Sequence, residues 1–134
     1  MVRVIDASVA IKWFVDEDRR ETALGILDEA IDDPRAFAVP ELFFFELGHV
    51  FHRLIRRPTA EQVGLLETVI DLGIVRFNMT RELLRGIGRF QRIGLSGYDS
   101  AYVALAEQLE GQWITFDGQA HKLLRKTGLS QLLS

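Results

Sequence analysis

The 134-residue sequence contains no cysteine, only three prolines and no long apolar run. Without cysteine it can form neither disulfides nor thiolate metal sites. No apolar stretch approaches the roughly 18 residues of a membrane span. Its start also lacks the basic segment and apolar core of a secretory signal. We therefore expect a protein of the cytoplasm with no membrane segment.

The sequence also lacks an excess of positive charge. Lysine and arginine number 16 against 19 acidic residues, so the net charge is −3. This balance does not by itself indicate nucleic-acid binding, but the distribution of charge matters more than its sum. Basic residues gather in three clusters, Arg53, Arg56 and Arg57, then Arg81, Arg85, Arg89 and Arg92, then Lys122, Arg125 and Lys126. Taken alone, each cluster is typical of a solvated helix face.

Short apolar stretches alternate with helical patterns along the chain. Strands are expected at 2–5, 36–40, 73–77 and 112–116, with a weaker one in 129–133. Helices are expected from about Ser8 and over 16–33, 40–57, 59–72, 80–93, 95–110 and 117–128. This alternation predicts one α/β domain over residues 1–134, with helices on both faces of a largely parallel sheet.

Three helix starts carry capping signals. Thr59 to Gln62 and Ser96 to Asp99 both match the capping-box pattern, in which a hydroxyl and an acid or amide satisfy free N–H groups. Thr80 is expected to cap the helix over 80–93. Pro40 is expected in the first turn of the helix over 40–57, where proline is tolerated.

Two acids follow predicted strands directly. Asp6 comes after the strand at 2–5, and Asp117 comes after "WITF". In parallel α/β sheets, ligands bind beyond the carboxyl ends of the strands, so both acids should lie at that edge. Each has a plainer interpretation. Asp6 can cap the first helix, and the pair formed by Asp117 and Gly118 is an ordinary turn signal.

Two further acids lie on helices. Glu46 sits inside an apolar helix, where a carboxylate without a partner is costly to bury. An ion pair with Arg53, or a half-exposed helix edge, would explain it. Asp99 begins the helix over 95–110 and is explained equally well by the capping box.

The four acids together say more than each alone. If Asp6, Glu46, Asp99 and Asp117 meet, their charges repel and a cation is needed to neutralise them. Oxygen ligands without cysteine favour Mg²⁺ or Mn²⁺. Such a centre suits the hydrolysis of phosphodiesters. No zinc-protease, nucleophile-elbow or P-loop motif is present.

The histidines suggest a competing metal site that the rest of the sequence does not favour. Glu46 and His49 have the E-x-x-H spacing of di-iron helical bundles, but those bundles need two such motifs, and the predicted strands exclude a bundle. His49, His52 and His121 are therefore expected to be structural or surface residues.

Four segments resemble a known family. The stretches "VIDASVAIKWF", "VPELFFFELGHVF", "LSGYDSAYVALAE" and "WITFDGQAHKL" occur in that order over nearly the whole chain. The set is similar to PIN-domain ribonucleases, and specifically to VapC-type toxins of bacterial and archaeal toxin–antitoxin pairs. The resemblance implies a PIN-like three-layer α/β/α domain with a mostly parallel central sheet of four to five strands, and an endoribonuclease dependent on Mg²⁺ or Mn²⁺.

The resemblance also assigns residues. It implies that the metal-binding catalytic acids are Asp6, Glu46, Asp99 and Asp117, and that the positions of Ser8 and Thr115 support them. The family commonly has asparagine three residues after the glutamate, where this sequence has His49, so His49 would have to substitute for it.

The resemblance further implies partners. These are an RNA substrate, often tRNA or ribosomal RNA, a VapB-type antitoxin and a second copy of the chain in a homodimer. Some aromatics of "LFFFEL" could face the antitoxin, although their spacing places most in the core. The arginines assigned to RNA phosphates are Arg53, Arg56, Arg89 and Arg92.

Two alternatives stay open from the sequence. One is a catalytically inactive module of the same fold that binds RNA or protein. The other is a receiver-like phosphoacceptor domain, which needs an acidic pair after the first strand and an aspartate after the third. Here Ile5 precedes the single Asp6, and "GIVRFN" contains no aspartate.

Overall fold

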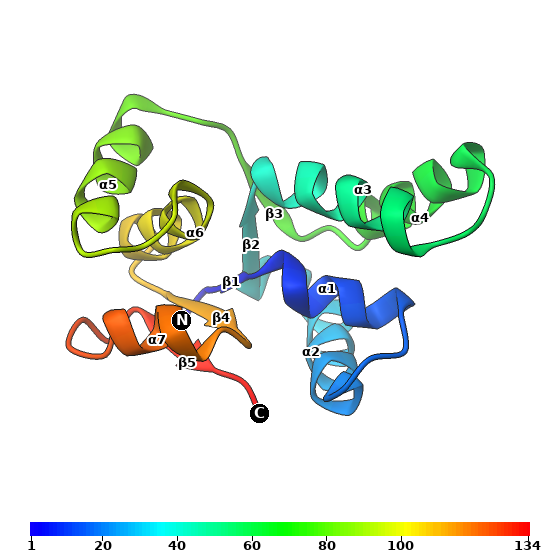
Figure 1. Cartoon of the computed structure of the whole chain (residues 1–134), viewed down its shortest axis with the longest axis horizontal. Coiled ribbons are helices and arrows are strands. Elements are labelled where there is room, and N and C mark those ends of the chain that lie inside the picture. Colours follow the sequence, from blue (N-terminus) through cyan, green and yellow to red (C-terminus); the bar gives the residue numbers. More distant parts are fainter.

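Five short strands form the centre of the computed structural model, which describes residues 1–134 (Figure 1). They are β1 (Arg3–Ile5), β2 (Phe37–Pro40), β3 (Val75–Phe77), β4 (Gln112–Thr115) and β5 (Ser130–Leu132). All neighbours pair in parallel, in the order β3-β2-β1-β4-β5. The predicted α/β fold is confirmed, with a sheet that is wholly parallel. The tail strand pairs through Trp113 and Ser130.

Seven α-helices and one 3₁₀ turn connect the strands. They are α1 (Ala7–Phe14), α2 (Arg20–Asp32), η1 (Pro34–Ala36), α3 (Leu42–Leu54), α4 (Thr59–Asp71), α5 (Arg81–Arg92), α6 (Gly97–Gln108) and α7 (Gly118–Leu123). None combines the length and apolar character needed to cross a membrane.

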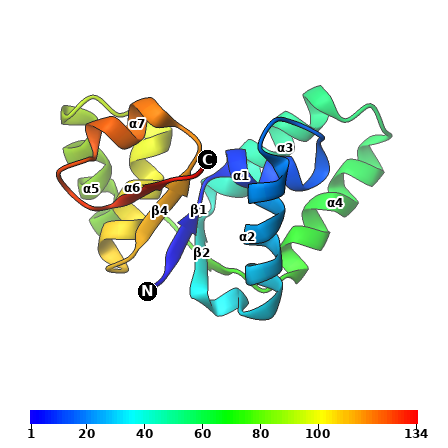
Figure 2. The same cartoon turned by 90° about the horizontal axis from the view of Figure 1, so that it is seen from below.

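The helices divide between the two sides of the sheet. α1 to α4 lie on one side and α5 to α7 on the other, as both views show (Figures 1 and 2). Right-handed crossovers explain the division, because the chain runs outward from β1 to β3 and then returns to β4 and β5 on the far side of β1. The strand order therefore reverses between β1 and β4, and the carboxyl ends of these two strands form the switch point where such sheets bind ligands.

The two strands at the switch point are buried on both faces. Val4 and Ile5 of β1 and Trp113 and Ile114 of β4 have no exposed surface. Each such side chain stabilises the fold by about 1.5–3 kcal/mol. The residues that follow these strands are therefore held on a rigid base.

Gly111 sets the approach of β4 to β1. A Cβ atom at this position would lie 2.0 Å from the carbonyl oxygen of Val2. The next residue, Gln112, donates its backbone N–H to the same oxygen at 3.1 Å. Only glycine allows this close passage of the two backbones.

Two of the predicted caps are confirmed. The Thr80 hydroxyl accepts the N–H of Leu83 at 3.0 Å, and the Ser96 hydroxyl accepts the N–H of Asp99 at 3.0 Å. Both bonds satisfy N–H groups in the first turn of a helix, which have no partner within the helix.

The predicted capping box at Thr59 is wrong. Pro58 occupies the capping position, so α4 already begins at Thr59, and the Thr59 hydroxyl lies one position too late to cap. Gln62 does not reach back to the helix start. Its amide instead donates to the carbonyls of Ile55 and Arg57, at 3.2 and 3.0 Å, and closes the loop between α3 and α4.

Two expected helices are shorter than their patterns suggested. The helix expected over 16–33 begins only at Arg20, because Arg19 has a left-handed φ of 61°. The helix expected over 40–57 runs from Leu42 to Leu54, because Ile55 is extended ahead of Pro58. Pro40 ends β2 and does not enter the helix.

Candidate active site

Asp6 lies at the switch point, directly beyond β1, and is only 8% exposed. Its Oδ2 accepts hydrogen bonds from the hydroxyls of Ser8 at 2.7 Å and Thr115 at 2.8 Å. Asp6 occupies the capping position of α1, but its side chain makes no capping hydrogen bond. The capping interpretation is therefore wrong for its carboxylate, which two hydroxyls from different elements orient instead.

Asp117 lies beyond β4, beside Asp6. Its backbone N–H donates to the Thr115 hydroxyl at 3.0 Å, so Thr115 connects both acids. Asp117 also caps α7, because its Oδ1 accepts the N–H groups of Gln119 and Ala120 at 3.0 and 3.1 Å. Gly118 is the first residue of α7, so the pair caps a helix and does not form a separate turn, and the cap occupies only one of the two carboxylate oxygens.

Glu46 projects from the middle of α3 and is half-buried. Its Oε1 is buried without a hydrogen-bond partner, and it forms no ion pair with Arg53. The Tyr102 hydroxyl lies close enough to lower the pKa of Glu46, but not in the geometry of a full hydrogen bond. The ion-pair interpretation is wrong, and Glu46 is left with an unsatisfied oxygen.

Asp99 stands in the first turn of α6 and is also half-buried. Burial, followed by the charges of Asp6 and Asp117, raises its pKa to about 6, while the Ser96 hydroxyl lowers it. Asp99 therefore faces the same acids that the sheet edge brings together.

The same coupling appears at the other buried acids. Burial raises the pKa of Asp6, and the Asp117 charge raises it further against the opposing hydrogen bonds of Ser8 and Thr115. Burial also raises the pKa of Glu46, with added contributions from the charges of Asp6 and Asp99. The acids from β1, α3, α6 and β4 thus form one electrostatically coupled cluster.

The cluster fits a hard divalent cation held partly through water. No three carboxylate or histidine side chains are arranged as a ready-made metal cage. Mg²⁺, however, needs only one or two direct carboxylates and keeps several of its waters. The donors are all oxygens, and one oxygen of Glu46 has no hydrogen-bond partner. The pKa values of Asp6, Glu46 and Asp99 are all raised, so a bound cation would favour their ionised forms. The residues therefore fit Mg²⁺ or Mn²⁺.

Two adjoining cavities contain three of these acids, whereas Asp99 lines neither. The first, of about 410 Å³, is lined by Asp6 and Asp117 together with Ser8, Lys12, Arg19 and Arg53, among others. The second, of about 320 Å³, is lined by Glu46 and His49 and shares Val50 with the first. Of the four arginines assigned to RNA, Arg53 thus lies in the acid-lined cavity, and His49 lies beside Glu46.

The other three arginines do not reach these cavities. Arg89 pairs with Glu107 on α6, an exposed contact. Arg56 and Arg92 are exposed and line neither acid-lined cavity. Among the histidines, His121 shares a hydrogen bond of 2.7 Å with the Ser130 hydroxyl, in agreement with the predicted structural role.

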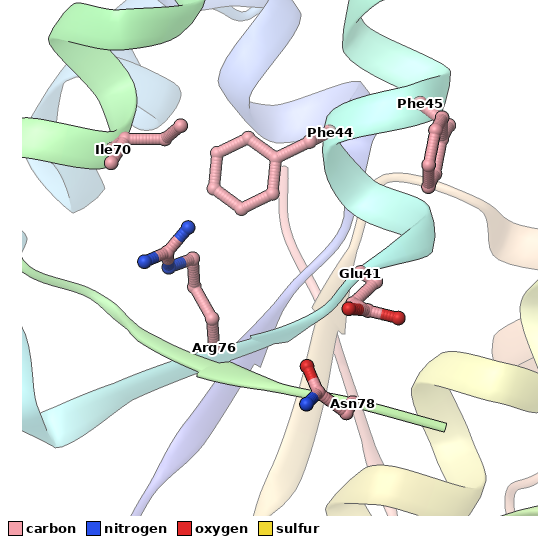
Figure 3. A pocket seen from close by; sticks show the side chains of 6 residues that line it. All are labelled: Glu41, Phe44, Phe45, Ile70, Arg76 and Asn78. Atoms are coloured by element: carbon pink, nitrogen blue, oxygen red, sulfur yellow. The ribbon is translucent and has the colours of Figure 1, made fainter.

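A third cavity, of about 380 Å³, lies between α3, α4 and β3 (Figure 3). The ring of Phe44 points toward Ile70 and Arg76, whereas Phe45 turns away from them. Glu41 is its only acid, so this cavity contains none of the coupled cluster.

Sequence reasoning missed three residues at the site. Lys12 stands between apolar residues in the sequence of the first helix, and this pattern could have indicated a buried cation. Arg19 and Tyr102 carried no comparable local signal, because the fold alone brings them close to the acids.

The sequence matches the model of the family described as PIN domain over residues 3–126. The chain is also 27% identical to "Ribonuclease VapC3" of Pyrobaculum aerophilum over 124 residues, which cover 89% of this chain and 92% of that protein. The predicted resemblance to PIN domains is confirmed.

Solved structures agree on the fold. A toxin–antitoxin complex from Klebsiella pneumoniae aligns with a TM-score of 0.70 and 15% identity, over 96% of this chain and 95% of that one. Mycobacterium tuberculosis VapC20, described as a sarcin–ricin loop cleaving toxin, aligns with a TM-score of 0.72 and 13% identity, over 95% of both chains.

Proposed function

The chain belongs to the PIN-domain family, and from that premise we propose that it is a metal-dependent endoribonuclease and the toxin of a toxin–antitoxin pair. One observation carries the proposal. Four carboxylates that lie far apart in the sequence come together near the switch point of the sheet, and burial together with the neighbouring charges raises the pKa values of three of them, Asp6, Glu46 and Asp99. The similarity to a ribonuclease supports the choice of RNA as substrate.

In this proposal Asp6, Glu46 and Asp99 hold Mg²⁺ or Mn²⁺, and Asp117 completes the site. The bound ion would supply a Lewis acid that activates water and offsets charge on the phosphate oxygens. Asp117 has one oxygen fixed by the α7 cap, so the other can orient the attacking water. Arg53, in the same cavity, binds a phosphate next to the cleaved bond.

Ser8 and Thr115 are positioning residues in this mechanism. Both donate to one oxygen of Asp6, and these bonds favour the ionised carboxylate and offset part of the rise in its pKa that burial causes. His49 lines the cavity beside Glu46, where its ring can take the role of the family's asparagine and contact RNA.

The proposed partners are an antitoxin of the VapB type and a second copy of the chain. The solved complex from Klebsiella pneumoniae supports the first. Phe45 and Tyr98 are 76% and 66% exposed and line the cavity beside Glu46, so they offer an aromatic surface for the antitoxin. The name of VapC20 supports a structured ribosomal RNA as substrate, with tRNA as the other candidate. An RNA substrate of either kind implies action in the cytoplasm.

The test is RNA cleavage by purified protein. Wild type is expected to cut RNA with Mg²⁺ or Mn²⁺ and to stop when EDTA is added. Asp6→Asn and Asp99→Asn should each lose more activity than the 10- to 100-fold typical of residues outside the direct ligand set. Asp28→Asn, on the exposed face of α2, is the matched control. Full activity in both site variants would refute the assignment. Wild type that binds RNA without cutting it would identify a binding module of the same fold.

A further inference from the structure

The acid-lined cavity contains a buried cation that the proposed mechanism does not use. Lys12, on α1, is only 8% exposed. Its Nζ lies 5.0 Å from the centre of the Phe116 ring and 3.9 Å from Glu17 Oε1. An ammonium hydrogen-bonded to a carboxylate lies at about 2.7–2.9 Å. Lys12 is therefore held by the ring and only loosely paired with an acid.

A second cation lies against the same ring. The guanidinium of Arg19 is 4.8 Å from the centre of Phe116. Arg19 is one of only two non-glycine residues with a left-handed backbone, a conformation that costs roughly 1–2 kcal/mol. Its neighbour Arg20 fixes the turn, donating to the carbonyls of Lys12 at 2.9 Å and Trp13 at 3.1 Å.

Phe116 ties both cations to the reaction centre. It directly precedes Asp117 and lines the same cavity as Asp6. The Lys12 and Arg19 charges lie 5.0 and 4.8 Å from the centre of the same ring, so the distance between the two charges cannot exceed the sum of these values. Arg19, like Lys12, has one acidic neighbour, Asp18 at 3.8 Å, which is longer than a charge-assisted hydrogen bond. Both cations therefore remain available to an anion that enters the cavity.

We propose that Lys12 and Arg19, held against Phe116, form a binding site for a backbone phosphate of the RNA, adjacent to the phosphate being cleaved. The inference rests on the proposed ribonuclease function. Lysine supplies a compact charge and arginine two parallel donors, a combination that suits a phosphate. The strained turn at Arg19 is maintained because it keeps the guanidinium over the ring.

Binding of a short fluorescein-labelled RNA of mixed sequence tests the site. Anisotropy is measured with EDTA present over a range of salt concentrations, and kcat/KM is measured with Mg²⁺. Lys12→Met and Arg19→Gly should each weaken binding about tenfold and reduce the slope of log K against log salt by about 0.7. Glu17→Gln should tighten binding about twofold, because a competing carboxylate is removed.

The controls separate binding from folding. Lys126→Met removes an exposed charge at the opposite edge of the sheet, before β5, and should leave both affinity and slope unchanged. Arg19→Gly should unfold no more easily than wild type, because glycine favours the left-handed backbone. Lys12→Arg should restore most of the affinity that Lys12→Met loses.

The outcomes distinguish this inference from the proposed function. If wild type cuts RNA but Lys12→Met and Arg19→Gly match Lys126→Met in affinity and slope, the phosphate site is refuted and the nuclease stands. If wild type neither binds nor cuts RNA, both are refuted. Weakened binding of a polyglutamate peptide with RNA binding unchanged would assign the cations to an acidic protein partner and also refute the phosphate site.

Discussion

Replacing Asp99 with asparagine is expected to stabilise the metal-free protein near neutral pH and to abolish RNA cleavage. The pKa of Asp99 is raised from 3.8 to about 6, chiefly by burial. An acid whose pKa is higher in the folded protein ionises more readily in the unfolded chain. The free energy of unfolding therefore falls as the pH rises from about 4 through 6, and Asp99 reduces stability above that window.

The size of the effect follows from the shift. Two pKa units correspond to at most about 3 kcal/mol. Asp99 is only half-buried, so solvent screening reduces the figure, and we expect about 1–2 kcal/mol. Asparagine removes the charge without changing the shape of the side chain. The gain should be largest near pH 7 and vanish near pH 4, where wild-type Asp99 is already neutral.

Urea unfolding with EDTA present measures this gain. Trp13 and Trp113 are both buried, so their fluorescence reports the transition. Asp28→Asn, which changes an exposed acid on α2, should leave stability unchanged at either pH. Mg²⁺ should stabilise wild type more than Asp99→Asn, because binding to the folded state alone adds to stability. An Asp99→Asn protein no more stable than wild type near pH 7 would refute the reasoning.

Three further changes have defined outcomes. Thr115→Val removes a hydrogen bond that lowers the pKa of Asp6, so the acidic limb of the pH–rate profile should shift to higher pH by roughly one unit. An acidic limb at the wild-type pH would show that this bond does not set the pKa of Asp6. Asp117→Asn should retain the α7 cap and lose activity, whereas Asp117→Ala should in addition lose about 1 kcal/mol in urea unfolding; equal stability of the two would contradict the capping role. Gly111→Ala should destabilise the fold by about 1–3 kcal/mol, because its methyl group collides with the Val2 carbonyl; a normal unfolding midpoint would show that the backbones can separate.

The fold was predictable where local patterns are strong. The alternation of short apolar strands with helices identified all five strands, including the weak tail strand. Helix boundaries were harder, because single backbone angles decide them. The left-handed Arg19 and the extended Ile55 each shortened a helix whose hydrophobic pattern continued past its end.

The site was predictable to the extent that parallel strands share an edge. Asp6 and Asp117 follow β1 and β4, so their proximity came from topology alone. What each carboxylate bonds could not be foreseen. Asp6 accepts from Thr115, which lies 109 residues away, and Asp117 proved to be the residue that caps a helix.

The cations show the same limit. Arg53 was found because it belongs to a cluster of basic residues in the sequence. Lys12 and Arg19 reach the acids only because Phe116 gathers them from α1 and the following turn. No spacing rule in the sequence connects these positions.

The strand order also dictates when the site can exist during synthesis. β1 emerges first, but its neighbour at the switch point, β4, is made more than a hundred residues later. Until residues 112–117 have left the ribosome, Asp6 has no Thr115 to orient it and Asp117 is missing. Under the proposed mechanism, a nascent chain that lacks β4 therefore cannot cut RNA, because the site is complete only when β4 docks beside β1.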